Sequence, residues 1–266
     1  MVRYSVNEVM LDGATLADDV RMLEELGVPA MGVDRRKLSA AGVADGAKLL
    51  ADSPVEVLFL QGVGPFSLTD RGRWPAELDE ARRALDETAS LGAGCLQMTI
   101  GSPGDLSYEE AEAAFLELLE QLVPMAAARR VVLAPEHNHA LRMDLGYIHS
   151  LHDALDLADQ VDSPWFGVCA EINNAWIERR LYENLATRHH RIPLLQINDF
   201  AAGTLCTPER VALGDGIIPL ERVMTTLVDA GFAGFFDLEV VGTQVRELGA
   251  RAVVERSLAW LARFDG

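Results

Sequence analysis

The chain has 266 residues, of which 49% are hydrophobic and 24% are charged, and this is the composition and length of one folded barrel domain. Its formal charge of −18 argues against a nucleic-acid partner, because such binding depends on Lys and Arg that displace condensed counterions. The longest apolar stretches, such as residues 55–60, are far shorter than the roughly 20 residues that cross a bilayer, so we expect no membrane association.

Eight short apolar runs alternate with longer segments of helical spacing, and each run is typical of a buried strand. An unbroken series of eight strand–helix units favours a closed barrel over an open sheet. We therefore predict an α/β fold, a (β/α)8 TIM barrel, as a single domain over residues 1–266. The predicted strands are Arg3–Asn7, Ala30–Val33, Val55–Leu60, Cys95–Ile100, Val131–Pro135, Trp165–Ala170, Ile192–Ile197 and Gly234–Val240.

Local signals mark where the helices begin and end. Thr15 precedes the first helical segment, and Ser107 with Glu110 three residues later forms a capping box. The segment Ala40–Asp52 contains two glycines, which predicts a short or broken helix. The Gly/Pro-rich segments 62–65, 101–104 and 203–216 each follow a strand, so we interpret them as loops of the barrel face and not as linkers.

Polar residues lie in or directly after the last four predicted strands, toward the carboxyl ends where a TIM barrel places its working groups. They are Glu136, Glu171, Gln196 and Glu239. A carboxylate on an apolar strand needs a compensating positive charge, and none of the three glutamates has a Lys or Arg beside it in sequence. Taken singly, each could pair with a distant arginine. Together they predict a shared divalent cation, Mn²⁺ or Mg²⁺ with Co²⁺ possible and zinc less favoured, because oxygen ligands suit hard ions.

The order of these residues resembles the xylose isomerase-like superfamily of sugar isomerases, epimerases and dehydratases. Its members place a Glu after strand five, Asp-x-x-His after strand six, His or Gln in strand seven and Glu in strand eight. These positions fall on Glu136, on Glu171 with Asn174, on Gln196 and on Glu239. Two of them depart from the family, because Glu171 replaces an aspartate and Asn174 replaces a histidine.

Two further segments extend the resemblance. Glu209–Gly216 is similar to the family's Arg-x-x-x-Gly-x-Gly loop, and Gly231–Gly234 is similar to its Gly-aromatic-x-Gly turn. Gln196 is like the hydroxypyruvate isomerase branch. The AP-endonuclease branch fits less well, because its histidine-rich metal cluster and its basic face are missing here.

The resemblance implies a divalent-metal-dependent epimerase or isomerase of a small keto-sugar or hydroxy-keto acid. Glu136 and Glu239 would move a proton through a metal-stabilised enediolate. One alternative is a dehydratase of the inosose or dehydroshikimate type, acting through the same enolate. Another, prompted by the altered strand-six motif, is a barrel without catalysis that serves as a binding or scaffold protein. A homodimer or homotetramer is also implied.

Several other residues are candidates for contact with a polyol or keto substrate. Arg210 suits oxygen pairs but could instead pair with Glu209 or Asp215. His137 and His139 could face the pocket or support Glu136. The remaining candidates are Asn174, the aromatic residues Trp74, Phe66 and Trp176, which could wall the pocket or pack in the core, and, more weakly, Asn7.

The three cysteines indicate a reducing compartment. Cys95, Cys169 and Cys206 are odd in number and form no C-x-x-C pair, and the first two lie in apolar runs. We therefore expect buried, reduced thiols in a cytoplasmic protein.

Overall fold

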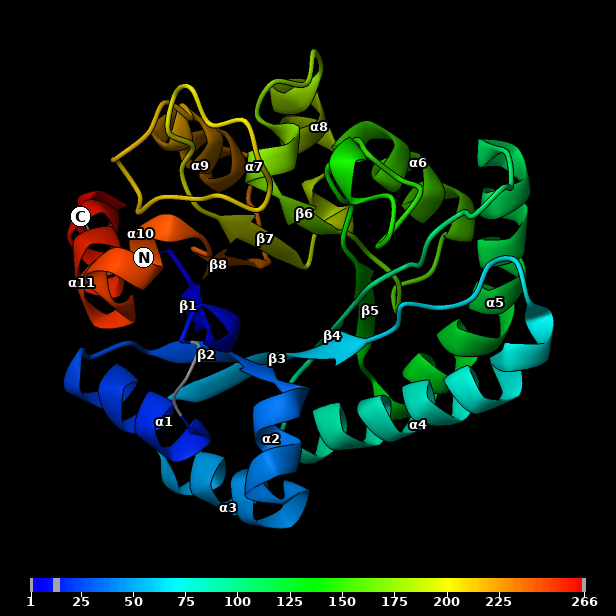
Figure 1. The fold of residues 1–266 in the computed structure, drawn as a ribbon, viewed down its shortest axis with the longest axis horizontal. Helices are drawn as coiled ribbons and strands as arrows, with labels where there is room; N and C mark the ends of the chain where they lie inside the picture. The colour runs from blue at the N-terminus through cyan, green and yellow to red at the C-terminus, as the bar shows by residue number, and fades with distance from the viewer. Residues whose placement is uncertain (1, 12–14, 265–266) are drawn as a thin grey trace.

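A computed structural model describes residues 2–11 and 15–264 and shows a ring of eight strands surrounded by helices (Figure 1). The paired strands of the ring run parallel to one another. The predicted (β/α)8 TIM barrel and all eight predicted strands are confirmed. The strands are β1 (Tyr4–Asn7), β2 (Ala30–Asp34), β3 (Glu56–Val63), β4 (Cys95–Met98), β5 (Val132–Pro135), β6 (Cys169–Glu171), β7 (Leu194–Ile197) and β8 (Phe235–Leu238).

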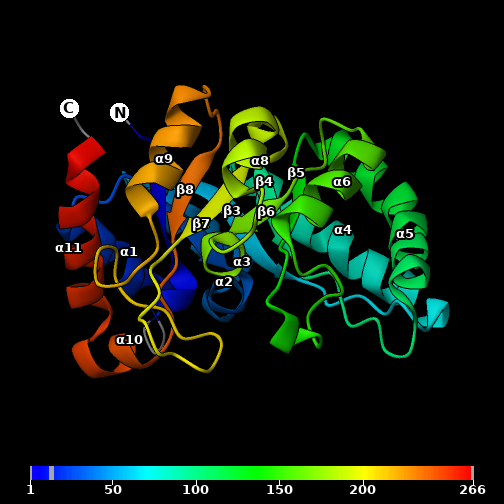
Figure 2. The same cartoon turned by 90° about the horizontal axis from the view of Figure 1, so that it is seen from above.

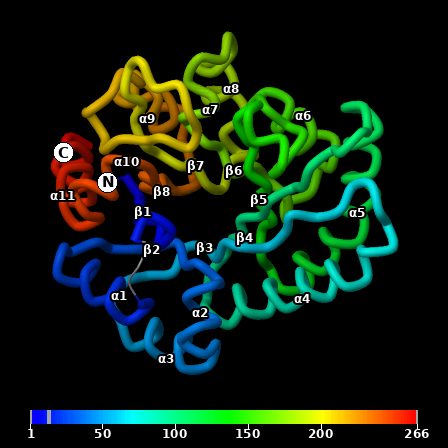
Figure 3. The backbone as a smooth tube through the Cα atoms, viewed as in Figure 1, coloured from blue at the N-terminus to red at the C-terminus, as the bar shows by residue number. Residues whose placement is uncertain are grey.

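The ring closes between β5 and β6, which stand at the two ends of the strand order β5-β4-β3-β2-β1-β8-β7-β6. Two isolated parallel bridges, Leu133 to Phe166 and Glu136 to Cys169, span this seam in the described part of the chain. The barrel is therefore nearly closed, and the backbone trace in Figure 3 follows it round the ring.

Helices occupy the crossovers outside the ring, and Figure 2 shows them on both sides of the strands. The Thr15 cap and the Ser107–Glu110 capping box are both present. The predicted break falls at Gly42, whose φ of 83° separates α2 from α3. The helices are α1 (Leu16–Glu25), α2 (Arg35–Ala41), α3 (Val43–Asp52), α4 (Trp74–Ser90), α5 (Tyr108–Arg129), α6 (Leu151–Val161), α7 (Ile172–Ala175), α8 (Leu181–Thr187), α9 (Leu220–Asp229), α10 (Thr243–Leu248) and α11 (Ala250–Leu261).

No helix within residues 2–11 and 15–264 combines the length and the apolar character needed to span a bilayer.

The barrel interior holds a small apolar cluster, separate from the larger core between strands and helices. Side chains alternate between the two faces of a strand, so the residue two positions further along points inward again. A polar layer therefore lies directly above the apolar one, toward the carboxyl ends. Cys95, Ala134, Cys169, Leu194 and Phe235 of the apolar cluster are followed two residues later by Gln97, Glu136, Glu171, Gln196 and Asp237.

Candidate active site

The guanidinium of Arg210 lies between two of the predicted metal ligands. Its Nη2 is 2.8 Å from Glu171 Oε2, and its Nη1 is 3.2 Å from Glu239 Oε2. The Arg210 side chain is only 9% exposed and that of Glu171 is fully buried. Burial lowers the pKa of Arg210, but the charges of Glu171 and Glu239 outweigh burial and raise it above its ordinary value. Arg210 is thus the buried counter-ion of the site.

The alternative partners expected for Arg210 are wrong. Glu209 lies near Arg246 and accepts a hydrogen bond from the Thr243 backbone N–H, while Asp215 pairs with Arg256. Both acids therefore contact residues other than Arg210. The Arg210 side chain instead points into the barrel mouth, toward Glu171 and Glu239.

Glu136 follows β5 directly and is oriented by two amides. Gln97 Nε2 donates to Glu136 Oε2 at 2.9 Å, and Asn138 Nδ2 donates to Oε1 at 3.2 Å. Burial, together with the charges of Glu239 and Glu171, raises the pKa of Glu136 to about 8. This carboxyl group therefore exchanges a proton near neutral pH, which is the range that suits an acid or base catalyst.

Glu171 is the last residue of β6, and the two oxygens of its carboxylate have different partners. Its Oε1 accepts from the Asn173 backbone N–H and from Asn198 Nδ2, both at 2.8 Å, whereas its Oε2 faces Arg210. Burial raises the pKa of Glu171 to about 7, although Arg210 lowers it in part. The glutamate that replaces the family's aspartate is therefore well held.

Gln196 lies inside the barrel beside Glu171, its partner in the β6–β7 register. Its Oε1 accepts from the Cys169 thiol, with Sγ at 3.3 Å. The Oε1 atom of Gln196, which we predicted as a metal ligand, therefore accepts a hydrogen bond from a neighbouring thiol in this structure.

Asp237 is a buried carboxylic acid of the site that the sequence reasoning missed. Ser5 Oγ donates to its Oδ1 at 2.6 Å and Asn7 Nδ2 donates to its Oδ2 at 2.9 Å. Burial raises the pKa of Asp237 well above its ordinary value. The available signal was the alternation along β8, since Phe235, Asp237 and Glu239 lie on the same face of the strand.

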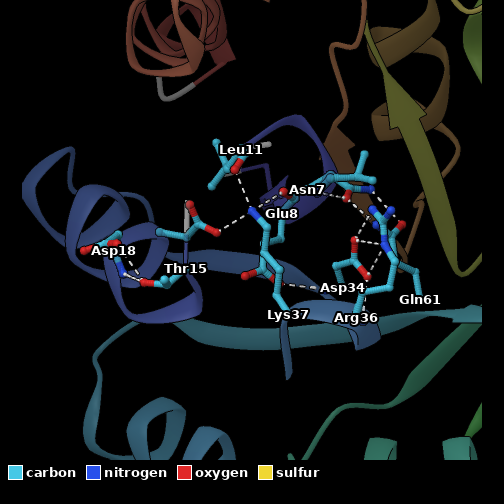
Figure 4. A network of polar contacts seen from close by, with 11 residues as sticks. Asn7, Glu8, Leu11, Thr15, Asp18, Asp34, Arg36, Lys37 and Gln61 are labelled. Carbon is cyan, nitrogen blue, oxygen red and sulfur yellow. Dashed lines mark hydrogen bonds and ion pairs between the residues drawn. The ribbon is translucent and has the colours of Figure 1, made fainter. Parts of the chain in front are cut away.

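Asn7, predicted as a substrate contact, belongs to this same polar network. Its amide exchanges hydrogen bonds with Gln61, at 3.2 Å and 2.9 Å, and Figure 4 shows the two side chains facing each other at the ends of β1 and β3. Asn7 thus links Asp237 of β8 to Gln61 of β3.

The charges of the site bear on whether it suits a metal. Glu171 Oε2 and Glu239 Oε2 are buried and accept no hydrogen bond within the described chain, and each faces Arg210 across the distances given above. Four acids, the buried Glu171 and Asp237 and the half-buried Glu136 and Glu239, are more carboxyl groups than one guanidinium neutralises. The donor set therefore fits a hard divalent cation. Within residues 2–11 and 15–264, however, no three Asp, Glu, His or Cys side chains are placed to hold an ion together, and the Arg210 guanidinium lies against Glu171 and Glu239.

Of the neighbouring predicted side chains, those of His139 and Asn174 form hydrogen bonds, whereas both ring nitrogens of His137 are buried without a hydrogen-bond partner in the described part of the chain. His137 is fully buried, and burial lowers its pKa to about 4, while its backbone carbonyl accepts from Asn174 Nδ2 at 3.0 Å. His139 Nδ1 accepts from the Leu141 backbone N–H at 3.2 Å. Asn174, in the place of the family's histidine, therefore ties the loop after β5 to α7.

Two of the three aromatic candidates belong to the core. Trp74 and Phe66 are buried in the large hydrophobic cluster, and the indole N–H of Trp74 donates to the Ser67 carbonyl at 2.7 Å. The expectation that Trp74 walls the pocket is corrected to a packing role at the start of α4. Trp176 is half-buried and lines a surface cavity.

Asp199, at the end of β7, organises the loop 199–218 that carries Arg210. Its carboxylate accepts backbone N–H groups of Gly214, Gly216 and Ile218, at 3.1, 3.1 and 2.9 Å. Asp199 and Val211 also exchange backbone hydrogen bonds, both at 2.9 Å. The sequence reasoning did not assign this role, although an aspartate before a glycine-rich loop was a usable signal.

The cysteines match the expectation in two of three cases. Cys95 and Cys169 are buried, and Cys206 is exposed, because it lies at the tip of the loop 199–218 and not on a strand. Burial raises the pKa of the Cys95 thiol to about 12.

An eight-stranded barrel with acids at the carboxyl ends of β5, β6 and β8 defines a class of TIM-barrel proteins whose site opens at that end. The chain belongs to the xylose isomerase-like TIM barrel family, whose model matches residues 20–264. The predicted family resemblance is therefore confirmed.

Individual relatives are more distant. L-ribulose-5-phosphate 3-epimerase UlaE of Shigella flexneri serotype 5b (strain 8401) is 28% identical over 182 residues, which are 66% of this chain and 60% of that protein. The protein SMc04130 of Sinorhizobium meliloti 1021 is 25% identical, with a TM-score of 0.89 over 96% of both chains. The IolI protein, solved with a bound zinc atom, is 17% identical, with a TM-score of 0.84 over 97% of this chain and 96% of its own.

Proposed function

We propose that the protein is an epimerase or isomerase that moves a proton at the carbon beside the carbonyl of a small keto-sugar or hydroxy-keto acid. The observation that carries the proposal is the pair Glu136 and Glu239 at one barrel mouth. The first has a pKa of about 8, and the second lies against Arg210. Two carboxyl groups in unlike surroundings are the arrangement from which acid and base roles arise. The epimerase name of the curated relative supports the same reaction class.

The surrounding residues orient this pair. Gln97 and Asn138 each donate to one oxygen of Glu136, which fixes the plane of its carboxyl group. Arg210 presents a buried positive charge, which stabilises negative charge on a substrate oxygen. A substrate held between Glu136 and Glu239 would lose a proton to one carboxylate and regain it from the other carboxyl group.

A divalent metal forms part of this proposal, with Mn²⁺ or Mg²⁺ expected. Glu136, Glu171 and Glu239 would hold it, with Gln196 as a fourth oxygen ligand. When bound, it would supply positive charge that acidifies the carbon beside the carbonyl.

Solvent deuterium exchange tests the reaction. The protein is incubated in D₂O with a panel of ketoses, inososes and hydroxy-keto acids, and NMR measures deuterium in the recovered compounds. We expect exchange at one carbon, reduced by about 10²–10⁴-fold in Glu136→Gln and Glu239→Gln, as is typical when a general acid or base is lost. Glu120→Gln is the matched control, because Glu120 is exposed on α5.

The same samples separate the alternatives. A product with the ultraviolet absorbance of a conjugated enone would replace the epimerase by a dehydratase of the inosose or dehydroshikimate type. Absence of exchange across the panel, together with no bound divalent ion by elemental analysis, would favour a binding or scaffold protein. The homodimer or homotetramer that we also propose is tested by light scattering, and a monomer contradicts it.

A further inference from the structure

A cavity of about 550 Å³ lies beside the acid cluster, between the loops that follow β5, β6 and β7. We call it the distal hollow. Its walls come from residues 139–141 after β5, residues 173–178 around α7, and residues 200–207 of the loop 199–218. In Figure 2 the green segment after β5 and the yellow loop after β7 project from the same end of the barrel.

One lining residue of the hollow, Asn173, is also one of the two residues that donate hydrogen bonds to Glu171. Asn173 lines the hollow, its backbone N–H donates to Glu171, and its side chain donates to Asn198 at 3.1 Å. Asn198 in turn donates to Glu171. A molecule with its reacting end at Glu171 therefore has the distal hollow next to it.

The walls of the hollow are aromatic and aliphatic. The rings of Trp176 and Phe200 lie with centroids 5.9 Å apart. At the rim, Leu141 is 67% exposed, Ile177 is 74% exposed and Leu205 is 94% exposed. Large apolar side chains gathered at one opening mark a binding surface, because scattered exposure would need no explanation.

The charged residues that line the hollow do not favour the binding of a phosphate group. None of its described lining residues is Lys or Arg, although phosphate recognition depends on such cations. Glu178 adds a carboxylate to the lining, which accepts from the Leu151 backbone N–H at 2.6 Å. Arg142 is next to the lining residue Leu141, but its guanidinium is bonded to Asp144.

We propose that the distal hollow is a subsite for an uncharged ring carried by the substrate, a sugar ring or an aromatic aglycone stacked on Trp176. The substrate is then a carbonyl compound of the glycoside type and not a sugar phosphate. The inference rests on the proposed function for where the reacting end of the substrate lies. Binding of the ring in the distal hollow can be measured without any reaction.

Ligand-observed NMR measures the relevant dissociation constants with three probes: phenyl β-D-glucopyranoside, glucose and glucose 6-phosphate. We expect the phenyl glucoside to bind about tenfold more tightly than glucose, since one well-placed aromatic contact supports a change of that size. Glucose 6-phosphate should bind no more tightly than glucose.

Two variants test the location. Trp176→Ala should remove the preference for the phenyl glucoside, and Trp176→Phe, which keeps a ring, should restore most of it. Leu205→Arg, at a side chain that is 94% exposed, should weaken binding of the phenyl glucoside and strengthen binding of glucose 6-phosphate. Leu248→Arg is the control, because Leu248 is 49% exposed at the end of α10, outside the hollow.

Three results would overturn the subsite. They are equal affinities for phenyl glucoside and glucose, tighter binding of glucose 6-phosphate to the unaltered protein, or a change of oligomeric state in Leu205→Arg, which would assign the rim to a second copy of the chain. These outcomes are independent of deuterium exchange on free ketoses. The subsite can therefore fail while the proposed reaction stands, and the reverse also holds.

Discussion

At the residue scale, the site is organised by the ion pairs of Arg210. Its guanidinium contacts Glu171 and Glu239 and is the cation that makes their burial tolerable. Removing one partner of a buried ion pair leaves an uncompensated charge and typically costs about 3–5 kcal/mol. We therefore expect Arg210→Met to unfold at markedly lower urea concentration than the unaltered protein in the presence of EDTA.

The same variant should respond to a divalent ion. If the carboxylates suit a cation, added Mn²⁺ should raise the urea midpoint of Arg210→Met more than that of the unaltered protein, because no guanidinium competes. Arg256→Met is the control, since Arg256 is 53% exposed in its pair with Asp215 and such pairs contribute little. Equal midpoints for Arg210→Met and the unaltered protein in EDTA would show that Arg210 is not the essential counter-ion.

Glu8, directly after β1, is another buried acid whose charge affects stability. Its Oε2 accepts from the Asp34 backbone N–H at 2.7 Å, and Lys37 lies close by (Figure 4). Asp19 and Lys37 both act on the charge of Glu8, and Lys37 Nζ is 2.7 Å from Asp19 Oδ2. Burial raises the pKa of Glu8 to about 8 from 4.5. The folded protein thus retains a proton that the unfolded chain releases.

This retained proton makes stability depend on pH. The contribution is complete below pH 4.5 and is lost as the pH rises toward 8, with a slope of up to about 1.4 kcal/mol per pH unit. Glu8→Gln mimics the protonated acid, so we expect a flatter dependence and a relative gain at pH 8. Urea unfolding at several pH values measures it, with Glu120→Gln as control. If the free energy of unfolding of Glu8→Gln depended on pH as steeply as that of the unaltered protein, the retained proton would belong to a group other than Glu8.

Part of the site could be predicted because parallel strands end at one face. Glu136 and Glu171 follow the fifth and sixth predicted strands and Glu239 lies near the end of the eighth, so their meeting follows from topology. The partners of Arg210 could not be predicted, since they depend on the path of the loop 199–218. Asp237 lay within reach of the alternation of strand residues, but it was overlooked beside Glu239.

At the scale of elements, a few neighbouring residues were sufficient to predict those features of the helices that depend only on contacts between such neighbours. The capping box of α5 and the break at Gly42 were both predicted from a few neighbouring residues. The short helix α7 was not predicted, because it depends on contacts between separate loops. One such contact is the bond from Asn174 to the His137 carbonyl.

The loop 199–218 provides a prediction at this scale. Asp199→Ala removes the acceptor of the backbone N–H groups of Gly214, Gly216 and Ile218. Of these three residues only Ile218 is buried, and an unsatisfied buried N–H group costs about 1–3 kcal/mol. We expect a lower unfolding midpoint and faster hydrogen exchange across residues 210–218. Asp215→Ala, which removes a surface acid of the same loop, should change exchange there much less. Equal exchange in the two variants would show that Asp199 does not anchor the loop.

At the scale of the whole molecule, the barrel has a seam at its functional side. Ladders join neighbouring strands elsewhere in the ring, whereas β5 meets β6 only through the two isolated bridges described above. Across the seam, the Leu133 backbone N–H donates to the Trp165 carbonyl and the Gly167 N–H donates to the Leu133 carbonyl, both at 2.9 Å. Glu136 and Glu171 stand on the two sides of this seam.

Local opening should therefore begin between β5 and β6, because fewer hydrogen bonds resist it there. In hydrogen exchange of the unaltered protein, we expect the amides of Leu133 and Gly167 to exchange sooner than ladder amides of β2, β3 and β8. A divalent ion or substrate that engages both Glu136 and Glu171 would link the two strands through their side chains, so it should slow exchange at the seam more than elsewhere. Protection that rises evenly around the ring, or a seam as slow as the ladders without ligand, would contradict this view of the barrel.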